Sequence, residues 1–102
     1  MELVEVKEFL EKLEQSQIHF DPHFYKRTHE RPITEGMIRS YLNNISKLEK
    51  IELGRSSERF KLWYKISTKY NLVIIIEIGI SKDLKVISAW NTYRKWKIRL
   101  KK

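Results

Sequence analysis

The first segment of the chain places its hydrophobic residues at helical spacing. Between residues 2 and 15 an apolar side chain recurs every three or four positions, and glutamates occupy many of the positions between. This pattern predicts an amphipathic first helix over residues 2–15 whose exposed side is acidic. The apolar positions are Leu3, Val6, Phe9, Leu10 and Leu13.

A second helix is predicted from a proline placed just inside its start. Asp21 followed by Pro22 is typical of an N-cap and a first helical position, because that position does not need the amide hydrogen that proline lacks. We expect this helix to reach about Arg31, since Pro32 disfavours helical backbone in the residue before it. Residues 17–20, which precede the helix, fit either a loop or a short extended piece.

A third helix is predicted to follow at once. Thr34 is its expected N-cap, and the apolar stripe behind Thr34 ends near residues 43–46. The second and third helices should therefore form a tight helical hairpin over residues 21–46. The stripe consists of Met37, Ile38, Tyr41, Leu42 and Ile45.

From residue 48 onward the pattern changes to a period of two, which predicts β-strands. Residues 59–66 alternate strongly, residues 48–53 alternate weakly, and a further strand is expected over 84–90. Residues 70–80 are apolar on both faces, which favours the centre of the sheet. In the strongly alternating strand we expect Phe60, Leu62, Tyr64 and Ile66 to face inward and Arg59, Lys61, Trp63 and Lys65 to face outward.

The order of these elements predicts one α+β domain over residues 1–102, with N-terminal helices packed on an antiparallel sheet of four to five strands. Its parts would be an acidic amphipathic helix (1–16), the helical hairpin (21–46), an antiparallel meander (48–91) and a basic tail (92–102). The apolar positions of the tail fit either an edge strand or one face of a helix.

The charge of the chain points to an anionic partner. It has 21 Lys and Arg residues against 13 Asp and Glu, a formal net charge of +8, and five of its glutamates lie in the first twenty residues. The rest of the chain is therefore more basic than the chain as a whole. This favours, as the partner, a phosphate backbone, an acidic protein or an anionic membrane surface. The solvated surface of a thermophilic protein rich in Lys, Glu and Ile would show the same excess.

The sequence also excludes several classes of protein. It has no cysteine, which rules out disulfides, thiolate catalysis and cysteine-ligated zinc. Its first residues do not have the pattern of a signal peptide, and its longest apolar run, residues 72–76, is far shorter than a bilayer span of ~20 residues. We therefore expect a cytoplasmic protein without membrane association. Its basic charge makes RNA the expected partner.

The second predicted helix carries the residues best suited to chemistry. His23, Arg27 and Arg31 lie at i, i+4 and i+8, so they share one edge of the helix. An imidazole can move a proton near neutral pH, and guanidinium groups offer forked donors to phosphate oxygens and to negative charge that develops on phosphorus. The alternative is a solvated helix face with its last arginine at the helix C-terminus. Lys26 and His29 lie on neighbouring faces.

Metal and cofactor chemistry find little support in the sequence. His19, His23 and His29 do not form an i, i+4 pair with a carboxylate between, and we expect Asp21 to serve as a cap. The three glycines are isolated rather than gathered in a phosphate-binding loop. We therefore expect neither a metal nor a cofactor.

The second candidate site is the segment 90–96, where aromatic residues alternate with amide, hydroxyl and cationic groups. Aromatic faces stack on unpaired bases while Lys and Arg hold the backbone of a single-stranded RNA. The alternative is that Trp90 and Trp96 anchor the end of the chain to the core. The predicted RNA-binding residues are Lys26, His29, Trp90, Asn91, Thr92, Tyr93, Arg94, Lys95 and Trp96.

These features together resemble a known family. The pattern His23-x3-Arg27-x3-Arg31-x-Ile33-Thr34, followed by an apolar-striped helix and an antiparallel sheet, is similar to small prokaryotic domains that have a His-x3-Arg-x3-Arg helix. Those domains are grouped with the RelE- and BrnT-like RNase toxins, which share a barnase-like fold. Residues 85–92 resemble the late strand of that family.

The resemblance implies a toxin of a toxin–antitoxin pair, which cleaves RNA without a metal by attack of the 2′-OH and leaves a cyclic phosphate. It implies that His23 is the general acid or base, that Arg27 and Arg31 hold the phosphate or the transition state, and that an acidic antitoxin-like partner masks the basic site. The acidic first helix departs from the minimal family domain. Two alternatives stay open, namely a non-enzymatic RNA- or DNA-binding protein that uses the same surface, and a basic module for an acidic protein.

Overall fold

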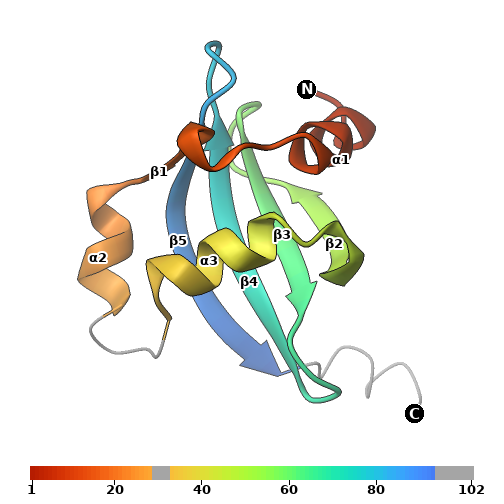
Figure 1. Ribbon diagram of the computed structural model, residues 1–102, viewed down its shortest axis with the longest axis vertical. Coiled ribbons are helices and arrows are strands. Elements are labelled where there is room, and N and C mark those ends of the chain that lie inside the picture. The colour runs from red at the N-terminus through yellow and green to blue at the C-terminus, as the bar shows by residue number, and fades with distance from the viewer. Residues whose placement is uncertain (29–32, 94–102) are drawn as a thin grey trace.

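The computed structural model describes residues 1–28 and 33–93, which form an α+β fold. In Figure 1, α1 and α3 lie over one face of a five-stranded sheet, and α2 lies at its edge beside β5. The helices are α1 (Leu3–Glu11), α2 (Pro22–Thr28) and α3 (Glu35–Leu42), with the 3-10 turns η1 (Gln15–Gln17) and η2 (Ile45–Lys47). The strands are β1 (Ile18–Phe20), β2 (Leu48–Leu53), β3 (Arg59–Lys65), β4 (Tyr70–Ile78) and β5 (Leu84–Tyr93).

The sheet is mixed, which corrects the prediction of an antiparallel sheet. Its strand order is β1-β5-β4-β3-β2, and β2 to β5 form the predicted antiparallel meander. The added strand is β1, which pairs in parallel with the start of β5, Ile18 opposite Leu84 and Phe20 opposite Val86. This is the segment that fitted either a loop or an extended piece. A segment of three residues is too short to show the alternation of a strand, so residues 18–20 are recognisable as a strand only from their pairing with β5.

The core lies between the sheet and the helices. β4 is the central strand, as predicted, and the inward set of β3 is confirmed, since Phe60, Leu62 and Tyr64 are fully buried. The helices contribute their own apolar stripes to the same cluster. The buried helical residues are Val6 and Leu10 of α1, Phe24 of α2, and Ile38 and Leu42 of α3.

The predicted helix boundaries are correct where a cap residue sets them. The Thr34 hydroxyl accepts a hydrogen bond from the Met37 amide at 3.1 Å, and α3 ends at Leu42, close to the predicted end. The first helix is shorter than predicted, because α1 ends at Glu11 and the chain turns into η1. Leu13, in the link between α1 and η1, still enters the core, which explains why the apolar spacing continues past the end of the helix.

The predicted helical hairpin is not confirmed. α3 crosses the sheet, whereas α2 packs beside β5, and the residues that would join them, 29–32, lie outside the described part of the chain. A hydrogen bond connects the two helices, from the Tyr25 hydroxyl to a Glu35 carboxylate oxygen at 2.6 Å. The tail over 94–102 also lies outside the described residues. Among the helices that are described, none is long and apolar enough to span a membrane.

Candidate nucleic-acid interface

The face of the sheet opposite α1 and α3, called the open face below, holds a basic groove. The outward residues of β3, including Lys61 and Trp63, lie on this face as the alternation predicted. The groove has a volume of about 620 Å³ and is lined from α2, the β2–β3 turn, β3, β4 and β5. Its polar and aromatic lining residues are His23, Arg55, Arg59, Lys61, Ser88 and Trp90.

A β-bulge in β5 shapes the floor of this groove. Ile76 pairs with Val86 whereas its neighbour Ile75 pairs with Ser88, so Ile87 is an extra residue in β5. Both Ile87 and Ser88 consequently line the groove instead of alternating between the two faces. The bulge therefore places the extra residue, Ile87, on the basic face beside Ser88.

The β2–β3 turn carries one side of the groove and depends on a close backbone approach. The Gly54 amide donates to the Arg59 carbonyl at 2.8 Å, and a Cβ atom at Gly54 would lie 2.8 Å from that same oxygen. Only glycine fits there without a shift of the neighbouring chain. The turn thereby brings Arg55 into the same groove as Arg59.

His23 is held by the residue that caps its helix. Asp21 Oδ1 accepts the His23 backbone N–H at 2.9 Å and lies 2.7 Å from His23 Nδ1. The backbone hydrogen bond from His23, and then its side-chain hydrogen bond, lower the pKa of the Asp21 carboxyl. An ionised carboxylate only accepts hydrogen bonds, so a ring with a single proton carries it on Nδ1 and leaves Nε2 as its acceptor nitrogen. The arrangement can therefore present a base to a ligand in the groove.

The cations of the groove are placed differently from one another. Arg59 lies 4.0 Å from Glu77, measured from Nη2 to Oε2, whereas Arg55 is exposed at the turn. Lys61 Nζ lies 5.1 Å from the centroid of the Trp63 ring and 5.4 Å from that of Trp90. Among the described residues that line the groove, none is acidic. Glu77 lies next to Arg59 but is not a lining residue, and a concave site lined by cations concentrates anions.

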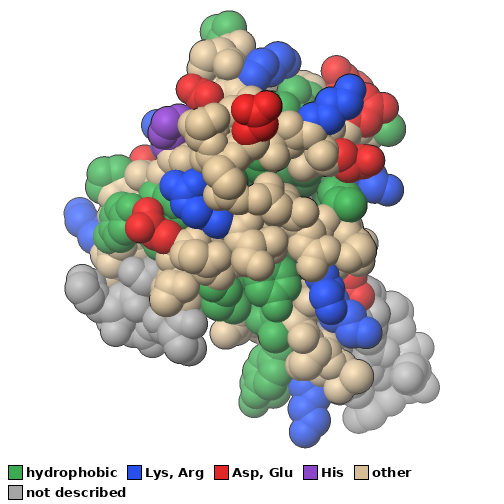
Figure 2. Space-filling view, in the orientation of Figure 1, with side chains coloured by type: hydrophobic (Ala, Val, Ile, Leu, Met, Phe, Trp, Pro, Cys, Tyr) green, Lys and Arg blue, Asp and Glu red, His purple; other side chains and the backbone are tan. Residues whose placement is uncertain are grey.

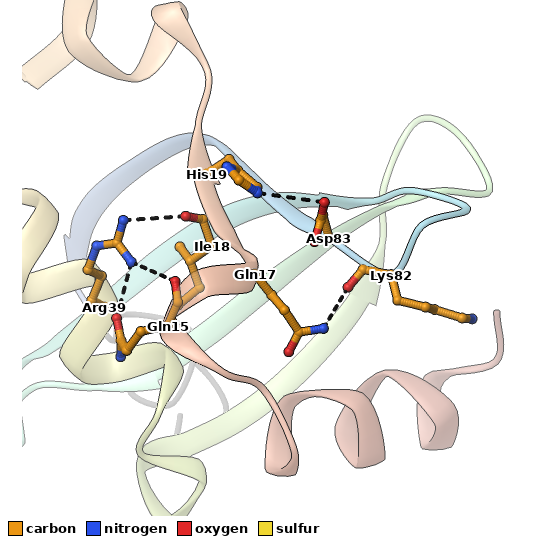
Figure 3. Close-up of polar contacts among 7 residues, drawn as sticks. All are labelled: Gln15, Gln17, Ile18, His19, Arg39, Lys82 and Asp83. Atoms are coloured by element: carbon orange, nitrogen blue, oxygen red, sulfur yellow. Dashed lines mark hydrogen bonds and ion pairs between the residues drawn. The ribbon is translucent and has the colours of Figure 1, made fainter.

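The segment that precedes His23 is fastened to the helix layer by one arginine (Figure 3). Arg39 of α3 donates through Nη1 to the Gln15 backbone oxygen at 3.0 Å and to its side-chain oxygen at 3.1 Å. Its Nη2 donates to the Ile18 carbonyl at 3.3 Å. Because these contacts surround the start of β1, they fix the strand that leads into Asp21.

The turn between β4 and β5 holds the same segment from its other side. Gln17 Nε2 donates to the Lys82 carbonyl at 2.9 Å, and His19 Nε2 lies 3.7 Å from Asp83 Oδ2 (Figure 3). At the end of β1 the Asp21 amide donates to the Val86 carbonyl at 2.9 Å. The backbone hydrogen bond of Asp21, rather than the exposed contact between His19 and Asp83, fixes the pair of Asp21 and His23 relative to β5.

The structure brings only part of the predicted site together. His23 and Trp90 line the groove, whereas Lys26 is exposed on α2 and is not among the lining residues. Arg27 belongs to α2, but its side chain lies outside the described part of the chain. The predicted residues His29, Arg31, Arg94, Lys95 and Trp96 lie wholly outside it.

The remaining predicted residues lie farther along β5. Asn91 is exposed, Thr92 is half-buried, and neither is among the lining residues of the groove. The Tyr93 ring packs on that of Tyr70, with centroids 4.7 Å apart. Asn91 pairs with buried Leu72 and Tyr93 with Tyr70, so alternation places both on the helix side of the sheet, away from the groove. Thr92 lies on the open face, beyond the lining residues of the groove.

Sequence reasoning missed the cationic half of the groove. Arg59 and Lys61 were expected to face outward, but nothing assigned them to a site together with His23. The signal that could have found them is the row Arg59, Lys61 and Trp63, in which cations and an aromatic residue share one strand face. Arg55 gave no such signal, because its position depends on the conformation of the turn.

The groove contains no evident metal site. In residues 1–28 and 33–93, no group of three or more His, Cys, Asp and Glu side chains is placed to hold a metal ion. Asp21 lies next to His23 but serves as its helix cap, as the sequence suggested.

No protein-family model, curated protein or solved structure matches this chain. The resemblance to RelE- and BrnT-like toxins therefore stays a prediction, and the groove has to be interpreted from its own chemistry.

Proposed function

We propose that the protein binds RNA in the groove of the open face and cleaves it without a metal ion. One observation supports this most strongly. His23, oriented by the Asp21 carboxylate 2.7 Å from its Nδ1, lines the same groove as three cationic side chains. These cations are Arg55, Arg59 and Lys61.

The reaction is an attack of a ribose 2′-OH on the adjacent phosphorus. His23 Nε2 accepts the 2′-OH proton, the bond between O2′ and phosphorus forms, and the bond from phosphorus to the 5′-oxygen breaks. The leaving oxygen takes a proton from water, and His23 releases the proton that it accepted. The products are a 2′,3′-cyclic phosphate and a 5′-hydroxyl end, so no other reactant is required.

The cations of the groove supply the electrostatic part of this reaction. Negative charge grows on the non-bridging oxygens as O2′ approaches phosphorus, and fixed donors that face these oxygens stabilise the transition state. Arg55 and Arg59 offer forked donors, while Lys61 offers a point charge. The groove volume of about 620 Å³ lies within the usual range of small-ligand sites, roughly 300–1,000 Å³.

The test is cleavage of an end-labelled synthetic RNA in the presence of EDTA. His23→Ala should lower the rate by roughly 100-fold or more, because general acid–base groups typically contribute 10²–10⁴-fold. His19→Ala is the matched control, since His19 is also an exposed histidine but is not among the lining residues of the groove. The products should carry a cyclic phosphate. Equal cleavage by His23→Ala and by the unaltered chain would refute the assignment.

A second candidate function is RNA or DNA binding without cleavage. The proximity of Lys61 to two indole rings favours it, because cations and aromatic faces suffice to bind a strand. Retained gel shifts with no cleavage product from any RNA tested would select this function over the first.

A further inference from the structure

A row of aromatic and cationic residues crosses the open face next to the groove. Trp63 of β3 and Trp90 of β5 both pair with Val73 of β4, so the two tryptophans lie on either side of the central strand. Val73 is fully buried although it faces away from the helices. Trp63, Trp90 and Lys61 are called the Trp–Lys–Trp row below.

The indole faces of this row are in contact with cations. Lys61 lies over both rings, and Lys50 Nζ lies 5.6 Å from the centroid of the Trp63 ring. The Trp63 indole N–H donates to Glu52 Oε1, which holds the ring in one orientation. In the described part of the chain, neither indole is paired with another aromatic ring. The ring faces are thus covered by lysine side chains, which can change rotamer.

We propose that the Trp–Lys–Trp row binds unpaired nucleobases and so restricts the substrate to single-stranded RNA, an inference that rests on the proposed function. A base stacks on an indole face in place of a lysine, and the displaced ammonium group binds a phosphate. In a duplex the base faces are already stacked on one another, so a duplex offers only its backbone to this surface.

The position of the row relative to the groove supports this occupant. Lys61 and Trp90 belong to the row and also line the groove, so a strand whose bases stack on the row keeps its backbone beside Arg55 and Arg59. An apolar peptide would offer no anion to Arg55 or to Lys61. A single-stranded polyanion satisfies the aromatic and the cationic residues together.

The test measures binding separately from cleavage. A labelled 2′-O-methyl RNA decamer lacks the attacking hydroxyl, so its affinity is independent of catalysis. Measured by fluorescence anisotropy with the full chain, the single strand should bind at least tenfold more tightly than the same decamer annealed to its complement. Trp63→Ala and Trp90→Ala should each weaken single-strand binding about tenfold and leave duplex binding unchanged.

Tyr70→Ala is the matched control. Tyr70 is also a partly exposed aromatic residue, but its position in β4, two before buried Leu72, places it on the helix side of the sheet. The Tyr70→Ala variant should bind the single-stranded decamer with the affinity of the unaltered chain. If an alanine variant fails to fold, Trp90→Leu keeps an apolar side chain over Val73 without an aromatic face and should show the same loss.

The two proposals fail in different ways. Equal affinity for single strand and duplex, an undiminished affinity in the tryptophan variants, or no binding of either probe would overturn the inference. Strong, tryptophan-dependent binding of the single strand with no cleavage of ordinary RNA would support the inference and overturn only the proposed cleavage.

Discussion

The two faces of the sheet are made by the same strands but have opposite chemistry. In β3, Leu62 is fully buried on the helix side, while the adjacent Lys61 lies over two indole rings on the open face. The helix side carries both acidic and basic side chains on its outer surface, with several acidic groups near α1 (Figure 2). The groove of the open face has cations and no acidic lining residue among those described. Alternate residues of one strand thus serve the core and the cationic groove.

The strongest test of this division is a pair of neighbouring substitutions. Leu62→Ala should lower the free energy of unfolding by about 2–5 kcal/mol, because it removes a fully buried side chain and leaves a cavity. Lys61→Ala should lower it by about 1 kcal/mol or less, since it removes only cation–π contacts at the surface. Urea unfolding measures both. A comparable loss in the two variants would show that the open face is also structural.

Asp21→Asn tests whether the Asp21 carboxylate orients the His23 ring for proton transfer. Asparagine is as good an N-cap as aspartate, so the helix start should survive, but the negative charge beside the His23 ring is removed. We expect RNA cleavage to fall roughly tenfold while RNA affinity changes little. Asp83→Asn, which removes the carboxylate next to His19, is the control and should cleave normally. An unchanged rate in Asp21→Asn would mean that the carboxylate does not assist the ring.

The same substitution has a pH signature. The hydrogen bonds from His23 lower the pKa of Asp21 in the folded chain. A depressed pKa stabilises the fold above the unfolded value of about 3.9, and this stabilisation is lost as the pH falls through the folded value. The unaltered chain should therefore lose more of its free energy of unfolding on acidification below about pH 4 than Asp21→Asn does. Parallel acid titrations followed by circular dichroism measure the difference.

The smallest expected effect concerns the one hydroxyl deep in the helix-covered side of β3. Tyr64 is fully buried, which raises the pKa of its phenol, and its oxygen has no hydrogen-bond partner in the described part of the chain. Tyr64→Phe should leave the free energy of unfolding unchanged or raise it by up to about 1 kcal/mol, because it removes an unsatisfied polar atom. Thermal unfolding measures it. A clear loss of stability would show that this face depends on a polar contact.

Local features of the sequence predicted the local parts of this structure. The alternation in β3 assigned its side chains to the correct faces, and Asp21 and Thr34 mark the starts of their helices. In each case the information lies within a few residues. The parallel pairing of β1 with β5 was not predictable in this way, because the two strands are separated by most of the chain and β1 is only three residues long.

The candidate site was predictable in part for the same reason. His23 was identified by its spacing, and Asp21 as a cap. The contact between the Asp21 carboxylate and the His23 imidazole was not predictable, because it depends on the side-chain geometry of the helix start. Arg55 joins the groove through a turn that needs Gly54, and Ile87 through a bulge in β5. Neither a turn conformation nor a bulge leaves a period in the sequence.

The pairing of β1 with β5 has a consequence for how the protein is made. The strand before Asp21 pairs only with β5 among the described strands, and α2 packs against β5. A nascent chain on the ribosome therefore lacks the strand on which the helix that carries His23 mainly packs until residues 84–93 have left the exit tunnel. The groove is thus completed only after the helices and β2, β3 and β4 have been synthesised.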